Sequence, residues 1–140
     1  VKFNAIEINE KASSLLEKVI PSENINKESI LDFNSDRKWD LTLVKGVLIH
    51  INPDQLKETY QKIFNSSSRY ILICEYYSRN PESLNYRGFT NKLYKRDFAG
   101  ELLDSFQNLT LLDYGFVYHR DPKFPQDDIS WFLLEKIQSK

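Results

Sequence analysis

Polar residues stand at the ends of apolar segments of this sequence, and their types suit ligand binding. Glu7 ends the first segment, where a carboxylate can accept hydrogen bonds from two ribose hydroxyls or simply favour the start of a helix. Gly46 follows the segment 40–45 and allows a ligand to approach the backbone closely. His50 comes soon after and can serve as a general base, donate a hydrogen bond to a substrate, or fix its own loop.

An aromatic and basic stretch over residues 76–95 follows the fourth apolar segment. Interleaved Arg, Lys and Tyr side chains can bind nucleic acid, can hold an anionic sugar or nucleotide-sugar, or can form a solvated lid. The chain has 19 basic and 20 acidic side chains and a net charge of -1, so no broad positive field attracts nucleic acid or an anionic membrane. Nucleic acid is therefore the least favoured of the three, and the other two readings stay open.

The segment 118–128 is also rich in functional groups, although loops of this length are frequently only connectors. His119, Arg120 and Asp121 together can orient a substrate. The two histidines lie far apart in the sequence and form no HxxxH pair, so we expect no metal site. The single Cys74 lies within an apolar strand, which predicts a buried, unreactive thiol and fits a reducing cytoplasm.

The apolar pattern alternates strands with helices. Strands are expected over 3–8, 24–27, 40–44, 70–75, 109–118 and 129–136, the third of them apolar on both faces as buried parallel strands are. Helices are expected to begin after the caps Asn9, Asn52 and Asp97, with apolar faces within 12–20, 56–64 and 98–106. The last two strands have no room for a crossover helix between them, so they should be antiparallel neighbours. The pattern predicts one α/β domain over residues 1–140, with a largely parallel sheet.

Length and composition place further limits on the protein. A chain of 140 residues with 41% hydrophobic side chains can form one domain with a real core. No apolar run reaches the ~18 residues that a membrane span needs, and we expect a cytoplasmic protein with no membrane partner. The sequence contains no Met and begins inside an expected strand, so we expect it to be a piece of a longer protein.

Several of these segments resemble a known protein family. Glu7 at a strand end, Ser29-Ile30-Leu31-Asp32 after the next strand, and KGVLIHINP over 45–53 are similar to class I S-adenosylmethionine-dependent methyltransferases. Five segments between residues 45 and 136 resemble the methylases associated with pseudaminic acid biosynthesis, namely KGVLIHINP, YILICEYY, YRGFTNKLYKRDFAGELLD, YGFVYHRDPKFPQDD and WFLLEK. The resemblance implies a Rossmann-like methyltransferase sheet with helices on both faces and a C-terminal antiparallel hairpin.

The resemblance also implies a role for each matching residue. S-adenosylmethionine would be the cofactor, with Glu7 on its ribose hydroxyls, Ser29 and Ile30 at adenine, and Lys45, Gly46 and Val47 beside its methionine part. His50 would lie on the acceptor side and take the acceptor's proton. The acceptor would be a small anionic sugar, a nonulosonic acid such as pseudaminic acid or its precursor or carrier-linked form. The acceptor-side candidates are Tyr86, Arg87, Lys95, Arg96, His119 and Arg120.

The sequence departs from the family pattern at one place. The family has a strand and a GxG-type loop before the position of Phe3, and the four glycines of this chain form no GxG pair. In the family that strand lies between the Glu7 strand and the Lys45 strand, so a partial sheet without it has two edges. We expect re-paired strands or a homo-oligomer, and weakened cofactor binding. The alternatives are a non-catalytic α/β binding or assembly module that has lost the cofactor loop, and a different nucleotide-binding α/β protein.

Overall fold

The computed structural model describes residues 1–137. The chain divides into two units, Val1–Asp36 (unit 1) and Arg37–Lys140 (unit 2). Unit 1 contains a short parallel strand pair, β1 (Ala5–Ile6) and β2 (Ile25–Asn26), whose register sets Ala5 opposite Ile25. Between them come α1 (Glu10–Leu16) and the 3₁₀ turn η1 (Ser22–Asn24). The predicted strands near 3–8 and 24–27 are therefore present but shorter.

Helix α1 begins as the sequence predicts and ends earlier. The Asn9 side chain accepts a hydrogen bond from the Ala12 N–H at 3.1 Å, which is the expected cap. The helix stops at Leu16, and Leu15 and Val19 are 62% and 76% exposed. The prediction of a helix that continues through residue 20 is therefore wrong. The buried position of the helix is Ser13, whose hydroxyl donates to the Glu7 carbonyl at 3.2 Å.

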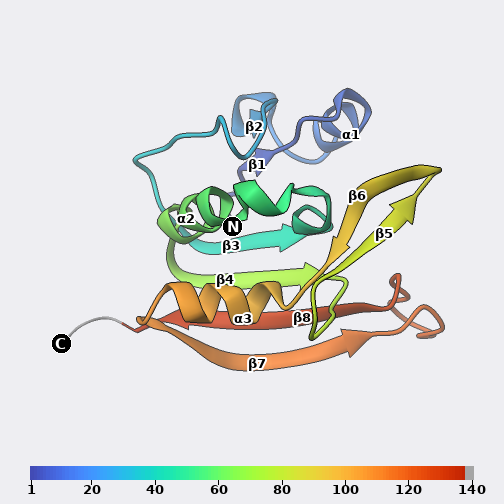
Figure 1. Cartoon of the computed structure of the whole chain (residues 1–140). Helices are drawn as coiled ribbons and strands as arrows, with labels where there is room; N and C mark the ends of the chain where they lie inside the picture. The colour runs from blue at the N-terminus through green and yellow to red at the C-terminus, as the bar shows by residue number, and fades with distance from the viewer. Residues whose placement is uncertain (138–140) are drawn as a thin grey trace. The chain divides into compact units, whose positions relative to one another are not determined.

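Unit 2 is built on a four-stranded mixed sheet with the order β3-β4-β8-β7 (Figure 1). Its strands are β3 (Trp39–Lys45), β4 (Ser67–Glu75), β7 (Leu109–Val117) and β8 (Ile129–Lys136). Strand β3 is parallel to β4, and β8 runs antiparallel to both β4 and β7. Among the described residues β1 and β2 form a sheet of their own, separate from β3.

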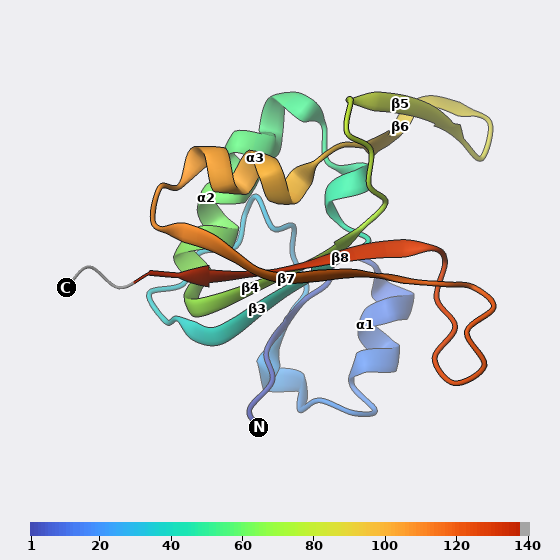
Figure 2. The same ribbon diagram turned by 90° about the horizontal axis from the view of Figure 1, so that it is seen from below.

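Both long helices of unit 2, α2 (Leu56–Ser66) and α3 (Phe98–Ser105), lie on the same face of this sheet (Figure 2). Asn52 caps the preceding 3₁₀ turn η3 (Pro53–Gln55) by accepting from the Asp54 N–H at 3.0 Å, and Asp97 caps α3 by accepting from the Gly100 N–H at 2.8 Å. Both caps were predicted. No helix within residues 1–137 combines the length and apolar character needed to cross a bilayer.

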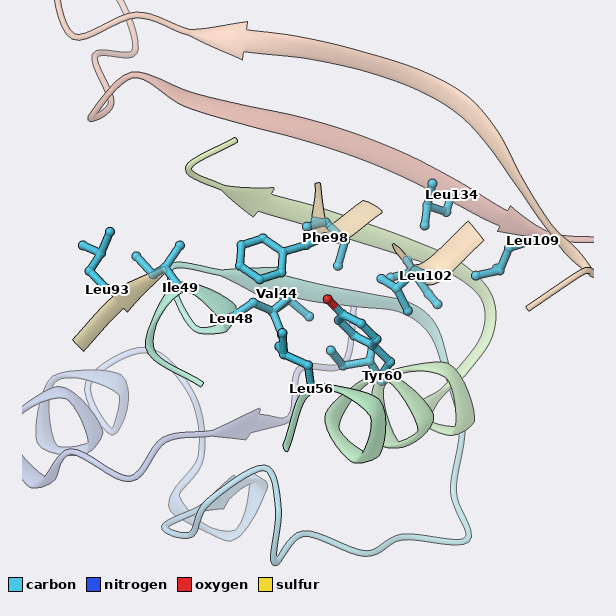
Figure 3. Close-up of a cluster of buried hydrophobic side chains, with 13 residues drawn as sticks. Val44, Leu48, Ile49, Leu56, Tyr60, Leu93, Phe98, Leu102, Leu109 and Leu134 are labelled. Carbon is cyan, nitrogen blue, oxygen red and sulfur yellow. The ribbon is translucent and has the colours of Figure 1, made fainter. Parts of the chain in front are cut away.

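The core of unit 2 fills the space between these helices and the sheet, as Figure 3 shows. The sheet contributes alternate residues, so Ile71 and Ile73 are 0% and 1% exposed while Leu72 between them is only half-buried. On the opposite face Leu41 and Leu43 are 47% and 57% exposed. The prediction that the third strand is buried on both faces is therefore wrong, because unit 2 places its helices on one face only. The helices contribute Leu56, Tyr60, Ile63, Phe98 and Leu102.

The stretch 76–95, predicted as a loop, folds instead into a hairpin of β5 (Glu82–Tyr86) and β6 (Phe89–Lys95). Arg87 and Gly88 form its two-residue turn, with φ of 49° and 81°. Positive φ at both central residues is typical of the tight turns that match strand twist, but the sequence signal for such turns is usually Asn-Gly. The hairpin extends beyond the carboxyl ends of β3 and β4 (Figure 1).

The junction between α2 and β4 is held by a lysine from the last strand. Helix α2 leads directly into β4, so the turn predicted over 65–68 is absent. Lys136 Nζ donates to the carbonyls of Phe64 and Ser67, the latter at 2.5 Å, and lies 3.7 Å from the centre of the Phe64 ring. The Phe64 carbonyl also accepts from the Ser67 N–H at the end of α2, so the Lys136 bonds reinforce the junction between the helix and β4.

Replacing Lys136 by Met should therefore destabilise the protein although the aliphatic stem is kept. We expect the free energy of unfolding to fall by ~1–3 kcal/mol, the cost of removing a charged donor from the Phe64 and Ser67 carbonyls at this junction. Urea denaturation followed by circular dichroism measures it. Lys57→Met on the exposed side of α2 is the control and should change stability by less than ~0.5 kcal/mol. Equal losses in both variants would show that Lys136 does not hold this junction.

Candidate functional site

A cavity of about 280 Å³ opens at the carboxyl ends of β3 and β4, within unit 2. In open α/β sheets this edge is where ligands bind, because loops from successive strands meet there. The walls come from β3, β4, the β5–β6 hairpin, the connection before β8 and the 3₁₀ turn η2 (Leu48–His50). Its polar residues include Lys45, His50, Glu75, Tyr76, Tyr86 and Asp127.

Gly46 forms an open part of this wall. Its φ is +64°, a conformation that side-chain-bearing residues rarely adopt, and no atom lies within 4 Å of the place where a Cβ would be. Its N–H donates to the Cys74 carbonyl at 3.1 Å and so continues the β3–β4 ladder by one residue. Beyond it the chain turns into η2. The sequence prediction that Gly46 permits close approach to the backbone agrees with this geometry.

Glu75 ends β4 and fixes the segment that follows Gly46. Its Oε1 accepts hydrogen bonds from the N–H groups of Val47 at 2.9 Å and Leu48 at 3.0 Å. The residue is only 3% exposed, and its Oε2 is a buried oxygen with no hydrogen-bond partner among the described residues. Burial raises the pKa of Glu75 from its ordinary 4.5 to about 7, and the N–H groups of residues 46–49 oppose this rise.

His50 lies between this cavity and a second one. Its Nδ1 is 3.0 Å from the Lys92 carbonyl, which can only accept, so Nδ1 carries the hydrogen and Nε2 of the neutral ring is an acceptor. Its ring centre lies 5.4 Å from that of Tyr86. This is the arrangement that a base needs, since the backbone fixes one nitrogen and leaves the other for a proton.

The second cavity, of about 500 Å³, is open and carries cationic and aromatic groups. It shares His50 and Tyr86 with the first and adds Arg87, Phe89 and Lys92 from the hairpin. The Arg87 guanidinium carbon lies 5.2 Å from the centre of the Tyr86 ring. Two cations beside aromatic rings suit a ligand that joins an anionic group to an apolar face.

Two other basic residues predicted on the acceptor side, Lys95 and Arg96, do not line either cavity and contact other side chains instead. Lys95 Nζ lies 5.4 Å from the centre of the Tyr76 ring. Arg96 Nε donates to Glu101 Oε1 at 2.7 Å, and the Tyr60 hydroxyl donates to Glu101 Oε2 at 2.6 Å. Arg96 therefore connects the end of β6 to both α3 and α2.

His119 and Arg120 lie in the connection between β7 and β8 and line neither of these cavities. His119 Nδ1 is 2.9 Å from Asp128 Oδ1, and the same oxygen accepts from the His119 N–H at 3.0 Å. These bonds lower the pKa of Asp128, whose backbone φ is +57°. The pair closes the connection at its base. The connection contacts the cavity wall through Gln126, whose Oε1 accepts from Lys45 Nζ at 2.6 Å.

The residues predicted to contact ribose and adenine belong to unit 1. Glu7 follows β1, and its Oε1 accepts from the Asn9 N–H at 2.7 Å, which orients the carboxylate. The Ser29 hydroxyl oxygen accepts from the Leu31 N–H at 3.2 Å, within the turn after β2. Glu7, Ser29 and Ile30 are all half-buried.

The structure brings four predicted site residues together around the first cavity, namely Lys45, Gly46, His50 and Tyr86. It adds Glu75, which the sequence interpretation left out although the residue ends a strand at the carboxyl edge. Position at that edge was the available signal. Cys74, expected to be deeply buried, is half-buried and lines the cavity. Burial raises the pKa of its thiol, which keeps it protonated and a poor nucleophile.

No protein-family model matches this sequence, and no curated protein does. Solved structures do match. The N-methyltransferase NodS from Bradyrhizobium japonicum is 12% identical with a TM-score of 0.69, and the match covers 98% of this chain and 74% of NodS. The 1,6-didemethyltoxoflavin-N1-methyltransferase from Burkholderia thailandensis, solved with S-adenosylhomocysteine, is 14% identical with a TM-score of 0.65, covering 98% and 72%.

An S-adenosylmethionine-dependent methyltransferase from Clostridium acetobutylicum is likewise 14% identical, with a TM-score of 0.62 and coverage of 98% and 76%. At such low identity the likeness concerns the course of the chain. The mixed sheet with its helices therefore has the α/β fold of S-adenosylmethionine-dependent methyltransferases.

Proposed function

We propose that this chain is a methyltransferase domain that uses S-adenosylmethionine and receives its acceptor in the first cavity of unit 2, the one at the carboxyl ends of β3 and β4. The observation that carries the proposal is the cavity itself, which in this fold lies at the carboxyl ends of β3 and β4 and presents Gly46 and His50. Methyl transfer needs few reacting groups, since the protein mainly holds the acceptor in line with the methyl group. The open backbone at Gly46 and the oriented side chain of His50 meet that need.

Each unit, taken by itself, contains residues whose chemistry suits one part of the cofactor. We propose that Glu7 binds the ribose hydroxyls, with Ser29 and Ile30 near adenine. The Glu7 carboxylate is already oriented by Asn9, and the open backbone at Gly46 leaves room for the methionine part beside Lys45 and Val47. When bound, S-adenosylmethionine supplies an electrophilic methyl group.

We further propose that the acceptor is an anionic sugar, a nonulosonic acid such as pseudaminic acid or its precursor. The resemblance of residues 45–136 to the associated methylases supports this, and so do the cations Arg87 and Lys92 beside Tyr86 and Phe89. His50 Nε2 would accept the proton of the acceptor. Lys95, Arg96, His119 and Arg120 stay proposals from the resemblance.

Calorimetric titration with S-adenosylhomocysteine tests the cofactor part of this proposal. We expect micromolar binding that weakens at least ~10-fold in Glu7→Ala, because a carboxylate that accepts ligand hydroxyls contributes a charged hydrogen bond. Glu10→Ala is the matched control, since Glu10 is an exposed acid in the first turn of α1. It should bind as the unmodified chain does.

The opposite result has a definite meaning. If the folded chain does not bind S-adenosylhomocysteine, the methyltransferase proposal fails for this chain, and the non-catalytic binding or assembly module becomes the better explanation. Equal binding by Glu7→Ala and the unmodified chain would instead remove Glu7 from the site.

A further inference from the structure

We propose that Glu75 is a positioning residue of the first cavity of unit 2, whose wall it helps to form. Its carboxylate holds the segment 46–49 in the shape that binds the ligand, and ionisation of the carboxylate tightens that hold. The part of this inference that concerns ligand affinity rests on the proposed function. The part that concerns the segment itself depends on unit 2 alone.

The contacts make Glu75 the link between the end of β4 and the wall of the cavity. The two N–H groups that it binds, those of Val47 and Leu48, come directly after the open glycine and begin η2, which ends at His50. Leu48 is fully buried, so its N–H has no solvent to bind if Glu75 is lost. Displacing this segment would move both Gly46 and His50.

Stability alone does not account for a carboxylate at this place. Glu75 is only 3% exposed, and no described residue donates a hydrogen bond to its Oε2. A glutamine would accept the same two hydrogen bonds through its side-chain oxygen without the cost of burying an acid. A buried acid that lines a cavity at a strand end is typical of functional sites, where ionisation has a use.

Ionisation changes how strongly Glu75 binds the segment. A carboxylate accepts stronger and shorter hydrogen bonds from N–H groups than a neutral carboxyl does. Burial raises the pKa of Glu75 and the N–H groups of residues 46–49 lower it, with no charged side chain among the causes. The titratable groups around the same cavity are Lys45, His50, Cys74, Tyr76, Tyr86 and Asp127.

Nuclear magnetic resonance of the whole chain tests the hold directly. We expect the amide signals of Val47 and Leu48 to follow one titration centred near neutral pH, and to lose it in Glu75→Gln, which keeps Oε1 as an acceptor. Glu135→Gln, which lies opposite Tyr70 at the far end of the β4–β8 pair, is the control and should leave this titration unchanged. Amides of the unmodified chain that do not titrate in this range would overturn the proposal, whether or not the chain binds a ligand.

The affinity for S-adenosylhomocysteine gives the second readout. We expect binding to strengthen between about pH 6 and about pH 8 in the unmodified chain, to be independent of pH in Glu75→Gln, and to be ~10-fold weaker in Glu75→Ala. His50 is present in all three proteins, so it cannot explain a difference between them. A slope that persists in Glu75→Gln would overturn the link to affinity. If nothing binds while the amides titrate, the proposed function fails and the hold by Glu75 stands.

Discussion

Replacing Ile71 by Ala lowers the free energy of unfolding by ~2–5 kcal/mol, whereas Leu72→Ala next to it costs only about 1 kcal/mol. Ile71 is fully buried in the centre of β4, opposite Thr42 of β3 and Leu134 of β8. Truncation there leaves a cavity that the sheet and two helices cannot close. Leu72 points to the other face, where Leu43 opposite it is 57% exposed.

Urea unfolding of the two variants and the unmodified chain measures both values. The comparison is well matched, because the residues are neighbours in one strand and each loses a branched aliphatic side chain. The expected order of the two stability losses depends on which face of the sheet the side chain occupies, and not on how hydrophobic it is. Equal losses in the two variants, or a larger loss for Leu72→Ala, would show that both faces of β4 are buried.

The sequence reveals much of this fold because its local signals agree with one another. Asn9, Asn52 and Asp97 all cap helical segments, since a side-chain oxygen before an apolar period satisfies N–H groups that the helix leaves open. The strands of 109–117 and 129–136 follow from segments rich in apolar residues, joined by a proline-containing connection. These elements were predictable from spacing alone.

The errors arise where tertiary context decides burial. Leu41 and Leu43 have the pattern of a strand covered on both sides, but only packing determines that unit 2 puts both helices on one face. The apolar spacing from Ala12 to Ile20 predicts one helix with an apolar face over that range, but α1 ends at Leu16. The hairpin turn at Arg87-Gly88 depends on a positive φ at an arginine, which residue type does not reveal.

Part of the candidate site was predictable from the order of the strands. Lys45, Gly46 and His50 follow a strand, and the rule that strand ends meet at one edge brings them to the cavity. Glu75 obeys that rule equally well. Its importance depends on Val47 and Leu48 donating to it across the β3–β4 junction, and a contact between residues 27 and 28 positions apart has no signature in the sequence.

Glu75 should also make the stability of the protein fall as the pH rises through neutrality. The pKa of the folded-state carboxyl, raised by burial to about 7, lies above its ordinary 4.5, so the folded state binds the proton more tightly than the unfolded state does. The resulting stabilisation is fully present below about pH 4.5 and is lost as the pH approaches and passes about 7. The difference corresponds to about 3 kcal/mol.

Other groups with shifted pKa values act outside this window. Asp121 and Asp128 have lowered pKa values because N–H groups and His119 bind them, so their contributions disappear only in acid. Burial lowers the pKa of Lys136 to about 8, and its effect begins above that value. A fall in stability between about pH 5 and about pH 8 is therefore attributable to Glu75 by comparison with a variant that cannot ionise.

Urea unfolding of the unmodified chain and of Glu75→Gln at several pH values in this range makes that comparison. The unmodified chain should lose about 3 kcal/mol from the acid to the alkaline end, and the variant should lack this loss. Because Gln is neutral and keeps one acceptor oxygen for Val47 and Leu48, the variant should be the more stable protein at the alkaline end. The same pH slope in both would mean that Glu75 is ionised throughout, and that the acid beside the cavity is solvated rather than buried.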